Sequence, residues 1–374
     1  MKYCTKTPGV GGRLRQRIED FKVEEIPKKM PPGEEFTLFW MEKFNEDTNR
    51  AIAVLAKYLH VSARRLSFAG TKDKRAVTKQ RVSAWKIEPE QLQKIDLKYI
   101  KLSGYETTSK RLMLGDLEGN KFIIKIRDIA LEKKDLEKRL KLLFSEIKKG
   151  IPNVFGVQRF GEVRPITHLV GKEILKGNLE EAAKVYLAYV YPGEPDDARD
   201  ARNFLNENWN EEGFRKAIDM FPQRLRYERS MLYYLADSPD DFAGAIRRFP
   251  KNLMKMFINA YQSYLFNEVS SDYISRGRKT VPLVGFDTRL GKNDIPMKDL
   301  LKKEGIKLEA FMSESMPELR CTGSERETIL VANDLKLENI EDDEFNPGKL
   351  CATVSFSLNP GSYATVILKE IMKD

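Results

Sequence analysis

The spacing of apolar residues changes twice along this chain, and that change constrains the fold more than any other feature. Segments 20–26, 35–44 and 122–129, together with 352–358 near the end, have the composition and alternation of β-strands. From about 166 to 278 the apolar residues recur at three- and four-residue spacing, which is typical of helices. The pattern predicts an α+β body whose sheet uses both ends of the chain, with a largely helical block inserted between them.

Two amphipathic helices are predicted within the N-terminal strand region. Apolar residues between 52 and 59 share one helical face, and a residue at 47–49 can cap its start. The second helix covers 135–149 and ends at Gly150 and Pro152. Inside the helical block, 191–203 is polar and contains proline, which favours a connection without regular structure.

The formal net charge of +9 and the pI of about 9.1 favour a polyanionic partner such as nucleic acid. A basic protein without such a partner is an equally good interpretation of charge alone. Hydrophobic residues make up 41% of the 374 residues, which indicates a globular chain large enough for more than one core.

Cysteine and histidine are scarce. The three cysteines include no C-x-x-C pair, and there are only two histidines, so we expect neither a metal site nor a disulfide framework. The first twelve residues lack the apolar run of a signal peptide, and no apolar stretch approaches the roughly 20 residues that span a bilayer. These patterns predict a soluble, cytoplasmic protein without a membrane partner.

The segment 62–83 is the most informative one. Asp73 is the only acid between Val61 and Arg81, among seven basic residues: Arg64, Arg65, Lys72, Lys74, Arg75, Lys79 and Arg81. One interpretation is a solvated basic loop in which Asp73 pairs with a neighbouring cation. The other is an ionised carboxylate that acts on a nucleobase while the cations hold RNA phosphates.

The residues of this segment resemble a known family. AGTKDKRAVTKQ (69–80) matches the pattern AG-x-KD-x-x-AVT-x-Q, the signature of the TruD family of pseudouridine synthases. PNVFGVQRFG (152–161) is similar to the family's N-x-FG-x-QRFG element. Four further stretches resemble family elements in the same order: EDFKVEEI (19–26), RLMLGDLEGNKF (111–122), AYQSYLFN (260–267) and SFSLNPGSYATVILKEI (355–371).

The resemblance implies the fold of the pseudouridine synthase core, a mixed and mainly antiparallel sheet with helices and a central cleft. It also implies an inserted, largely helical TRUD domain that helps to choose the RNA. With the periodicity, it places the core at 1–163 and 319–374 and the inserted domain at 164–318.

The family isomerises a uridine in RNA by breaking its glycosidic bond and rejoining the base through carbon. The resemblance therefore implies a tRNA substrate, with the uridine at position 13 as the usual target, and no cofactor. Asp73 would be the nucleophile, attacking either C1′ of the sugar or C6 of the base. The uridine has to leave its stack to be reached, so base flipping is expected.

The second matching segment implies contacts to the flipped base. Phe155 would stack on it, although a core aromatic is the commoner fate of phenylalanine. Asn153 would bond the polar edge of the pyrimidine, or serve as a turn residue after Pro152. Gln158 and Arg159 would support the cleft, and Arg159 could equally be a structural ion-pair partner.

Basic residues near Asp73 have implied roles as well. Arg15 stands where relatives often have lysine, and it would pair with Asp73, hold the target phosphate or be a plain surface arginine. Lys72, Lys74 and Arg75 would contact phosphates rather than take part in the chemistry.

Other functions remain as alternatives. They are a pseudouridine synthase acting on another RNA, and a non-catalytic RNA-binding protein on the same fold. A nucleotide-cofactor enzyme such as a methyltransferase is disfavoured, because the glycine-rich run at 9–12 neither follows a strand nor opens a helix. The oligomeric state is left open.

Overall fold

The computed structural model describes residues 3–161 and 163–373. The chain divides into two compact units. Unit 1 consists of Met1–Ile151 and Leu330–Asp374, and unit 2 is the continuous segment Pro152–Ile329. The chain passes between the units at two very short strands that pair with each other, β7 (Ile151–Pro152) and β10 (Ile329–Leu330).

Unit 2 begins before position 164 and ends after position 318, the two bounds expected from the sequence for the inserted domain. The segment after Pro152 belongs to unit 2 because its Phe155 packs against Phe266 of a helix in that unit. At the other end, β9 (Ser324–Glu327) pairs with β8 (Thr280–Leu283), which keeps the residues after 318 in unit 2.

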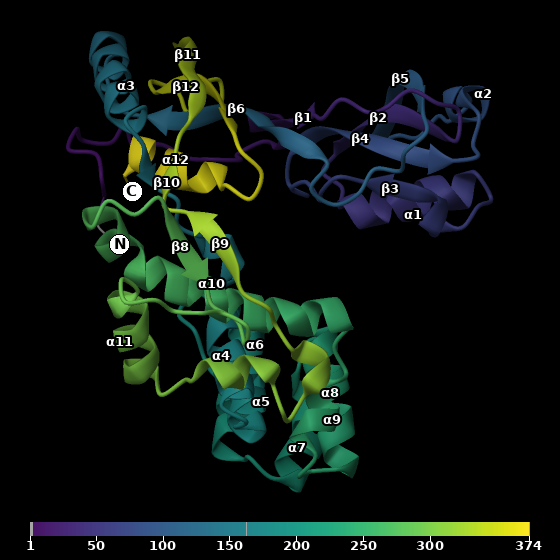
Figure 1. Cartoon of the computed structure of the whole chain (residues 1–374), viewed down its shortest axis with the longest axis vertical. Helices are drawn as coiled ribbons and strands as arrows, with labels where there is room; N and C mark the ends of the chain where they lie inside the picture. Colours follow the sequence, from purple (N-terminus) through teal and green to yellow (C-terminus); the bar gives the residue numbers. More distant parts are fainter. Residues whose placement is uncertain (1–2, 162, 374) are drawn as a thin grey trace. The chain divides into compact units, whose positions relative to one another are not determined.

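Unit 1 is built on an eight-stranded sheet in the order β11-β12-β6-β1-β4-β2-β5, with β3 paired to β4 (Figure 1). The β1–β4 pairing is parallel, whereas β1–β6, β6–β12, β11–β12, β2–β4, β2–β5 and β3–β4 are antiparallel. Its strands are β1 Phe21–Pro27, β2 Phe36–Phe44, β3 Leu66–Phe68, β4 Val77–Trp85, β5 Ile100–Thr108, β6 Leu117–Ile129, β11 Asn333–Asp342 and β12 Leu350–Leu358.

Both ends of the chain meet on β6. Its residues Phe122 and Ile124 lie opposite Val23 and Phe21 of β1, and opposite Phe356 and Val354 of β12. The prediction of a mixed, mainly antiparallel sheet with flanking helices, formed from both ends of the chain, is therefore confirmed.

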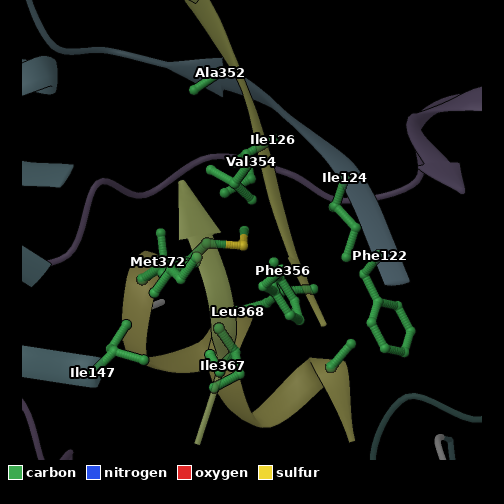
Figure 2. Close-up of a cluster of buried hydrophobic side chains, with 14 of the residues drawn as sticks. Phe122, Ile124, Ile126, Ile147, Ala352, Val354, Phe356, Ile367, Leu368 and Met372 are labelled. Carbon is green, nitrogen blue, oxygen red and sulfur yellow. The ribbon is translucent and has the colours of Figure 1, made fainter. Parts of the chain in front are cut away.

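The larger core of unit 1 lies between this part of the sheet and two helices, α3 (Lys133–Ile147) and α12 (Ala364–Met372). Figure 2 shows side chains of β6 and β12 directed toward Ile367, Leu368 and Met372 of α12. Alternate residues of each strand point to the same face, which is why the short apolar strands seen in the sequence cover one continuous core.

A second core in unit 1 lies where α1 (Thr48–Tyr58) packs against β2 and β4. Asp47 caps α1 by accepting hydrogen bonds from the main-chain N–H groups of Asn49 and Arg50. The short helix α2 (Pro89–Gln93) adds Leu92 to the same core. The start of α1 therefore has a fixed position beside β4.

Unit 2 is mainly helical, with the two-stranded β8–β9 sheet packed on its longest helix, α10. Its helices are α4 Thr167–Leu175, α5 Leu179–Leu187, α6 Asp196–Glu207, α7 Glu211–Met220, α8 Arg226–Asp237, α9 Phe242–Ile246, α10 Lys251–Ser275 and α11 Ile295–Glu304. Among the described residues, no helix is long and apolar enough to cross a membrane.

The prediction of an irregular connection at 191–203 is confirmed for 191–195 and was wrong for the rest of the segment. Residues from Asp196 onward form α6, whose buried face carries Ala198, Ala201 and Leu205 between charged positions. The helix also buries Arg202, which pairs with Glu194 at 3.0 Å and with Glu228 at 2.9 Å. Because Arg202 is charged, it interrupts the apolar stripe of α6 in the sequence, although the structure buries it. The sequence pattern therefore did not indicate a helix here.

Candidate active site

The predicted site residues fall into two groups, one in each unit. Asp73 lies in unit 1, on the loop between β3 and β4, and its side chain is 39% exposed. The guanidinium Nη2 of Arg15 lies 3.3 Å from Oδ2 of Asp73 and donates a hydrogen bond to it. Of the roles considered for Arg15, the pairing with Asp73 is therefore present in the structure.

Arg15 is held in place from two sides. Its guanidinium lies over the ring of Phe21 at 4.1 Å from the centroid, a cation–π contact. Its main-chain carbonyl accepts a hydrogen bond of 2.8 Å from Arg75. Its backbone has a φ of 56°, which is uncommon for a residue with a side chain. Arg15 is thus a fixed partner of Asp73 rather than a freely moving surface arginine.

The backbone of the Asp73 loop rests on buried polar side chains. The ammonium group of Lys43, on β2, donates to the carbonyl oxygens of Asp73 at 2.8 Å and Glu46 at 2.6 Å. Lys43 has no exposed surface, and burial lowers its pKa to about 8 against the raising effects of Asp47, Asp73 and Glu46. A buried donor of this kind fixes the carbonyl that it serves.

Thr48 and Gln80 complete this support. The N–H of Lys72 donates to Thr48 Oγ1 at 3.0 Å, and Thr48 in turn donates to Gln80 Oε1 at 3.1 Å. Gln80 Nε2 then donates to the carbonyl of Gly70 at 3.0 Å. Since Thr48 and Gln80 are fully buried, the loop is bonded to the core at Gly70 and Lys72, directly before Asp73.

The expectation that Lys72 contacts phosphate is wrong for this structure. Its ammonium group is buried and lies 2.6 Å from Oε2 of Glu25, whose carboxylate has no exposed surface. The other carboxylate oxygen of Glu25 accepts the N–H of Arg81. Burying either charge alone would be costly, so each requires the other, and Lys72 anchors the loop instead of facing solvent.

Lys74 and Arg75, which follow Asp73 in the loop, are exposed. Within residues 3–161 and 163–373, no side-chain hydrogen bond or ion pair engages Lys74, so its ammonium group is available to an anion. Arg75 uses one of its nitrogens on the Arg15 carbonyl and keeps further N–H donors. These two residues fit the expected phosphate contacts.

The second group of predicted residues lies at the start of unit 2. Phe155 is 6% exposed, and its ring meets the ring of Phe266 edge to face at 5.5 Å. Its main-chain N–H and C=O are both bonded by the side chain of Asn267. Phe155 therefore has a fixed backbone and a packed ring.

Arg326, on β9, joins Asn153 to Phe155. It donates to the carbonyl of Asn153 at 3.1 Å and to Oδ1 of the same residue at 2.8 Å, and its guanidinium lies 4.0 Å from the centroid of the Phe155 ring. Asn153 also donates from Nδ2 to the Glu327 carbonyl at 3.1 Å. One N–H and one oxygen lone pair of the Asn153 amide remain for another partner.

The remaining two predicted residues differ in their surroundings. Arg159 donates to Ser263 Oγ at 3.0 Å and to the Asn259 carbonyl at 3.4 Å, which ties it to α10 through hydrogen bonds. Gln158 is exposed. Arg159 thus supports the segment from within unit 2, whereas Gln158 faces outward.

Four residues of these two groups escape prediction from the sequence: Glu25, Lys43, Thr48 and Arg326. The signal that Glu25 and Lys43 offer is a charged residue on the alternating apolar face of a strand, since a buried charge requires a partner. Nothing in the local pattern marks Arg326. Among the described residues, no cluster of three or more His, Cys, Asp or Glu side chains could hold a metal ion.

The chain is similar over nearly its whole length to proteins of one family. The family model described as tRNA pseudouridine synthase D (TruD) matches residues 1–281 and 272–371. A probable tRNA pseudouridine synthase D of Methanococcoides burtonii is 39% identical over 99% of this chain and 95% of its own length. The corresponding protein of Archaeoglobus fulgidus is 34% identical over 99% of this chain and 97% of its own.

A solved structure shares the fold as well. The crystal structure of the putative tRNA pseudouridine synthase D (TruD) from Methanosarcina mazei superposes with a TM-score of 0.81 at 36% identity, covering 100% of this chain and 96% of that one. The match includes both units, and the similarity in sequence is well above the level at which fold alone is shared. The chain belongs to the TruD family of tRNA pseudouridine synthases.

Proposed function

We propose that this enzyme converts one uridine of tRNA, the one at position 13, to pseudouridine, with Asp73 as the nucleophile. The observation that carries the proposal is the setting of Asp73. Its carboxylate is partly exposed and paired with Arg15, while its backbone is bonded to buried side chains. A nucleophile held in one geometry reduces the entropy cost of reaching the transition state.

The reaction is a redox-neutral isomerisation. The bond between N1 of uracil and C1′ breaks, a bond between C5 and C1′ forms, the proton on C5 departs and N1 gains a proton. The Asp73 carboxylate would attack either C1′ or C6 to form a covalent intermediate, which is released when the new carbon–carbon bond is complete. Arg15, whose guanidinium lies 3.3 Å from the carboxylate and donates a hydrogen bond to it, would orient the carboxylate for this attack.

The residues of unit 2 would receive the flipped base. The proposal assigns stacking to Phe155 and the polar edge of uracil to the unused amide capacity of Asn153. In the free protein Arg326 covers one face of the Phe155 ring. The guanidinium of Arg159 also lies over this ring, 5.6 Å from its centroid, and Phe155 is 6% exposed. Stacking therefore requires that side chains around the ring move away.

Phosphate contacts would come from Lys74 and Arg75, which are exposed beside Asp73. We also propose a selective role for the helical unit in choosing the RNA and a cytoplasmic location, where tRNA is available.

The test is to incubate the protein with unmodified tRNA and map pseudouridine by carbodiimide modification and reverse transcription. The proposal predicts a single stop at the position of uridine 13. A stop at another uridine would reject the target. No stop on any tRNA, in spite of tight binding, would favour another RNA substrate or a non-catalytic role.

A further inference from the structure

A groove of about 770 Å³ lies on the surface of unit 2, along α8. Helix α8 packs against α7 and α9 (Figure 1). Its lining includes three arginines, two tyrosines and one acid: Arg226, Arg229, Arg248, Tyr233, Tyr234 and Asp237. None of these residues has a part in the proposed chemistry.

The spacing along α8 explains why these side chains face the same way. Residues 226, 230, 233 and 237 follow one another at intervals of four, three and four positions, so they share one face of the helix, and residue 234 lies four positions after 230 at the edge of that face. The opposite face is buried and carries Met231, Leu232 and Leu235. Packing of that apolar face forces the arginine and tyrosine side chains toward solvent, where Tyr233 is 53% exposed.

Two of the arginines hold the tyrosine rings. Arg229 donates to the carbonyls of Ile218 and Phe221 at the end of α7, and its guanidinium lies 5.7 Å from the centroid of the Tyr233 ring. Arg248 donates to Ser230 Oγ at 3.3 Å and lies 6.0 Å from the Tyr234 centroid. The rings are thus presented in a defined orientation, with cations beside them.

The third arginine of the groove, Arg226, differs from these two. In the part of the chain that the structure describes, no side-chain hydrogen bond or ion pair engages Arg226, which is exposed. Arg248 also keeps most of its N–H donors, because only Nε is used. Both guanidinium groups can therefore bind an anion at this groove.

The acids near the groove do not cancel this charge. Asp237 lies 3.7 Å from Arg215, an arginine that is not part of the groove lining. Asp241 accepts hydrogen bonds from the Tyr234 hydroxyl at 2.6 Å and from the N–H of Gly244 at 2.8 Å. Three arginines against one lining carboxylate leave a positive surface with two aromatic rings.

We propose that this α8 groove binds an unpaired stretch of the RNA substrate, with Arg226 and Arg248 on phosphates and the Tyr233 ring stacked on a base. The proposal rests on the proposed function for the identity of the RNA. Alternation of cations and aromatic rings is the arrangement by which proteins hold single-stranded nucleic acid, because phosphates and base faces alternate along the strand. An acidic peptide would satisfy the arginines but leave the rings unused.

The test compares Arg226→Ala and Tyr233→Ala with the control Lys216→Ala, which removes an exposed cation of α7 that pairs with Glu212. The Kd for unmodified tRNA is measured by filter binding at several salt concentrations. For Arg226→Ala we expect a rise of a fewfold and a salt slope smaller by about one. For Tyr233→Ala we expect a rise of about fivefold or more with the salt slope unchanged. The control should bind like the wild type.

Unchanged Kd values in both variants, with thermal unfolding showing that they are folded, would overturn the proposal. Tighter binding of the wild-type protein to polyglutamate than to an oligouridylate of equal charge would also overturn the proposal, provided that Arg226→Ala abolishes the binding of polyglutamate. Conversion of uridine at saturating tRNA is measured separately. If the wild-type protein converts no uridine while both variants weaken tRNA binding, the result contradicts the proposed activity but supports RNA binding by the α8 groove.

Discussion

The buried ammonium group of Lys43 donates a hydrogen bond of 2.8 Å to the main-chain carbonyl oxygen of Asp73. The two residues are 30 positions apart, on β2 and on the loop that precedes β4. The partly exposed carboxylate of Asp73 is thus attached to a backbone that a fully buried side chain holds. This relationship makes Lys43 a positioning residue for the proposed nucleophile.

Replacing Lys43 by methionine keeps the length of the side chain and removes the donor. The carbonyls of Asp73 and Glu46 then lose a buried partner, and the loop is free to shift. We expect the single-turnover rate at saturating tRNA to fall by about 10–100-fold, since small displacements of a catalytic group have effects of this size. Lys22→Met, which changes an exposed lysine of β1, is the control. A folded Lys43→Met variant with the wild-type rate would remove Lys43 from this role.

The same lysine predicts a pH dependence of stability. Burial lowers the pKa of Lys43 from its ordinary value of 10.5 to about 8. Between these values the unfolded chain holds a proton on Lys43 that the folded chain lacks, so the free energy of unfolding rises with pH through this window. Relative to Lys43→Met, it should increase by at most about 1.4 kcal/mol per pH unit. Urea unfolding of both proteins across the window measures this difference, and a constant difference would contradict the low pKa.

The two neighbouring lysines of the loop should respond differently to substitution. Lys72→Met leaves the buried carboxylate of Glu25 without its charged partner, which is expected to cost about 3–5 kcal/mol of stability. Lys74→Ala removes an exposed cation, so stability should hardly change while the salt dependence of tRNA binding falls by about one unit of slope. Thermal unfolding and binding titrations measure both. Equal stability of the two variants would contradict the structural role of Lys72.

The packing of Phe155 affects how its proposed stacking role is tested. Phe155→Ala would leave a cavity beside Phe266 and cost about 3–5 kcal/mol of stability, which obscures any effect on rate. Phe155→Leu fills most of that volume but removes the aromatic face. We expect it to remain folded and to slow single turnover about fivefold or more, the value of one base–aromatic contact. Wild-type rates in this variant would make Phe155 a packing residue only.

Much of the fold could be predicted because its elements have local patterns. The helix expected from the apolar face at 52–59 is α1, and Asp47 is its cap. The stripe at 135–149 is α3, and 122–129 lies within β6. By contrast, most residues of β5 are partly or fully exposed, with only its two ends buried, so Ile100–Thr108 has no clear alternation to recognise.

The site was less accessible to prediction, because its supports are contacts between distant residues. The pairing of Arg15 with Asp73 was one of several roles open to that arginine, and only the structure selects it. Lys72 lies in a run of basic residues that indicated phosphate binding, but its partner Glu25 lies 47 positions away. Charge patterns report the number of cations in a segment, whereas burial decides which of them remain available to a ligand.

The most direct test of the account is single-turnover release of tritium from tRNA labelled at C5 of uridine, with wild-type protein and Asp73→Asn. Release reports loss of the C5 proton, which accompanies formation of the C5–C1′ bond. The account predicts release by the wild type and none by Asp73→Asn, with tRNA affinity and thermal unfolding unchanged, because asparagine keeps the shape but lacks the nucleophilic carboxylate. Appreciable release by a folded Asp73→Asn variant would contradict the assignment of Asp73 as the nucleophile.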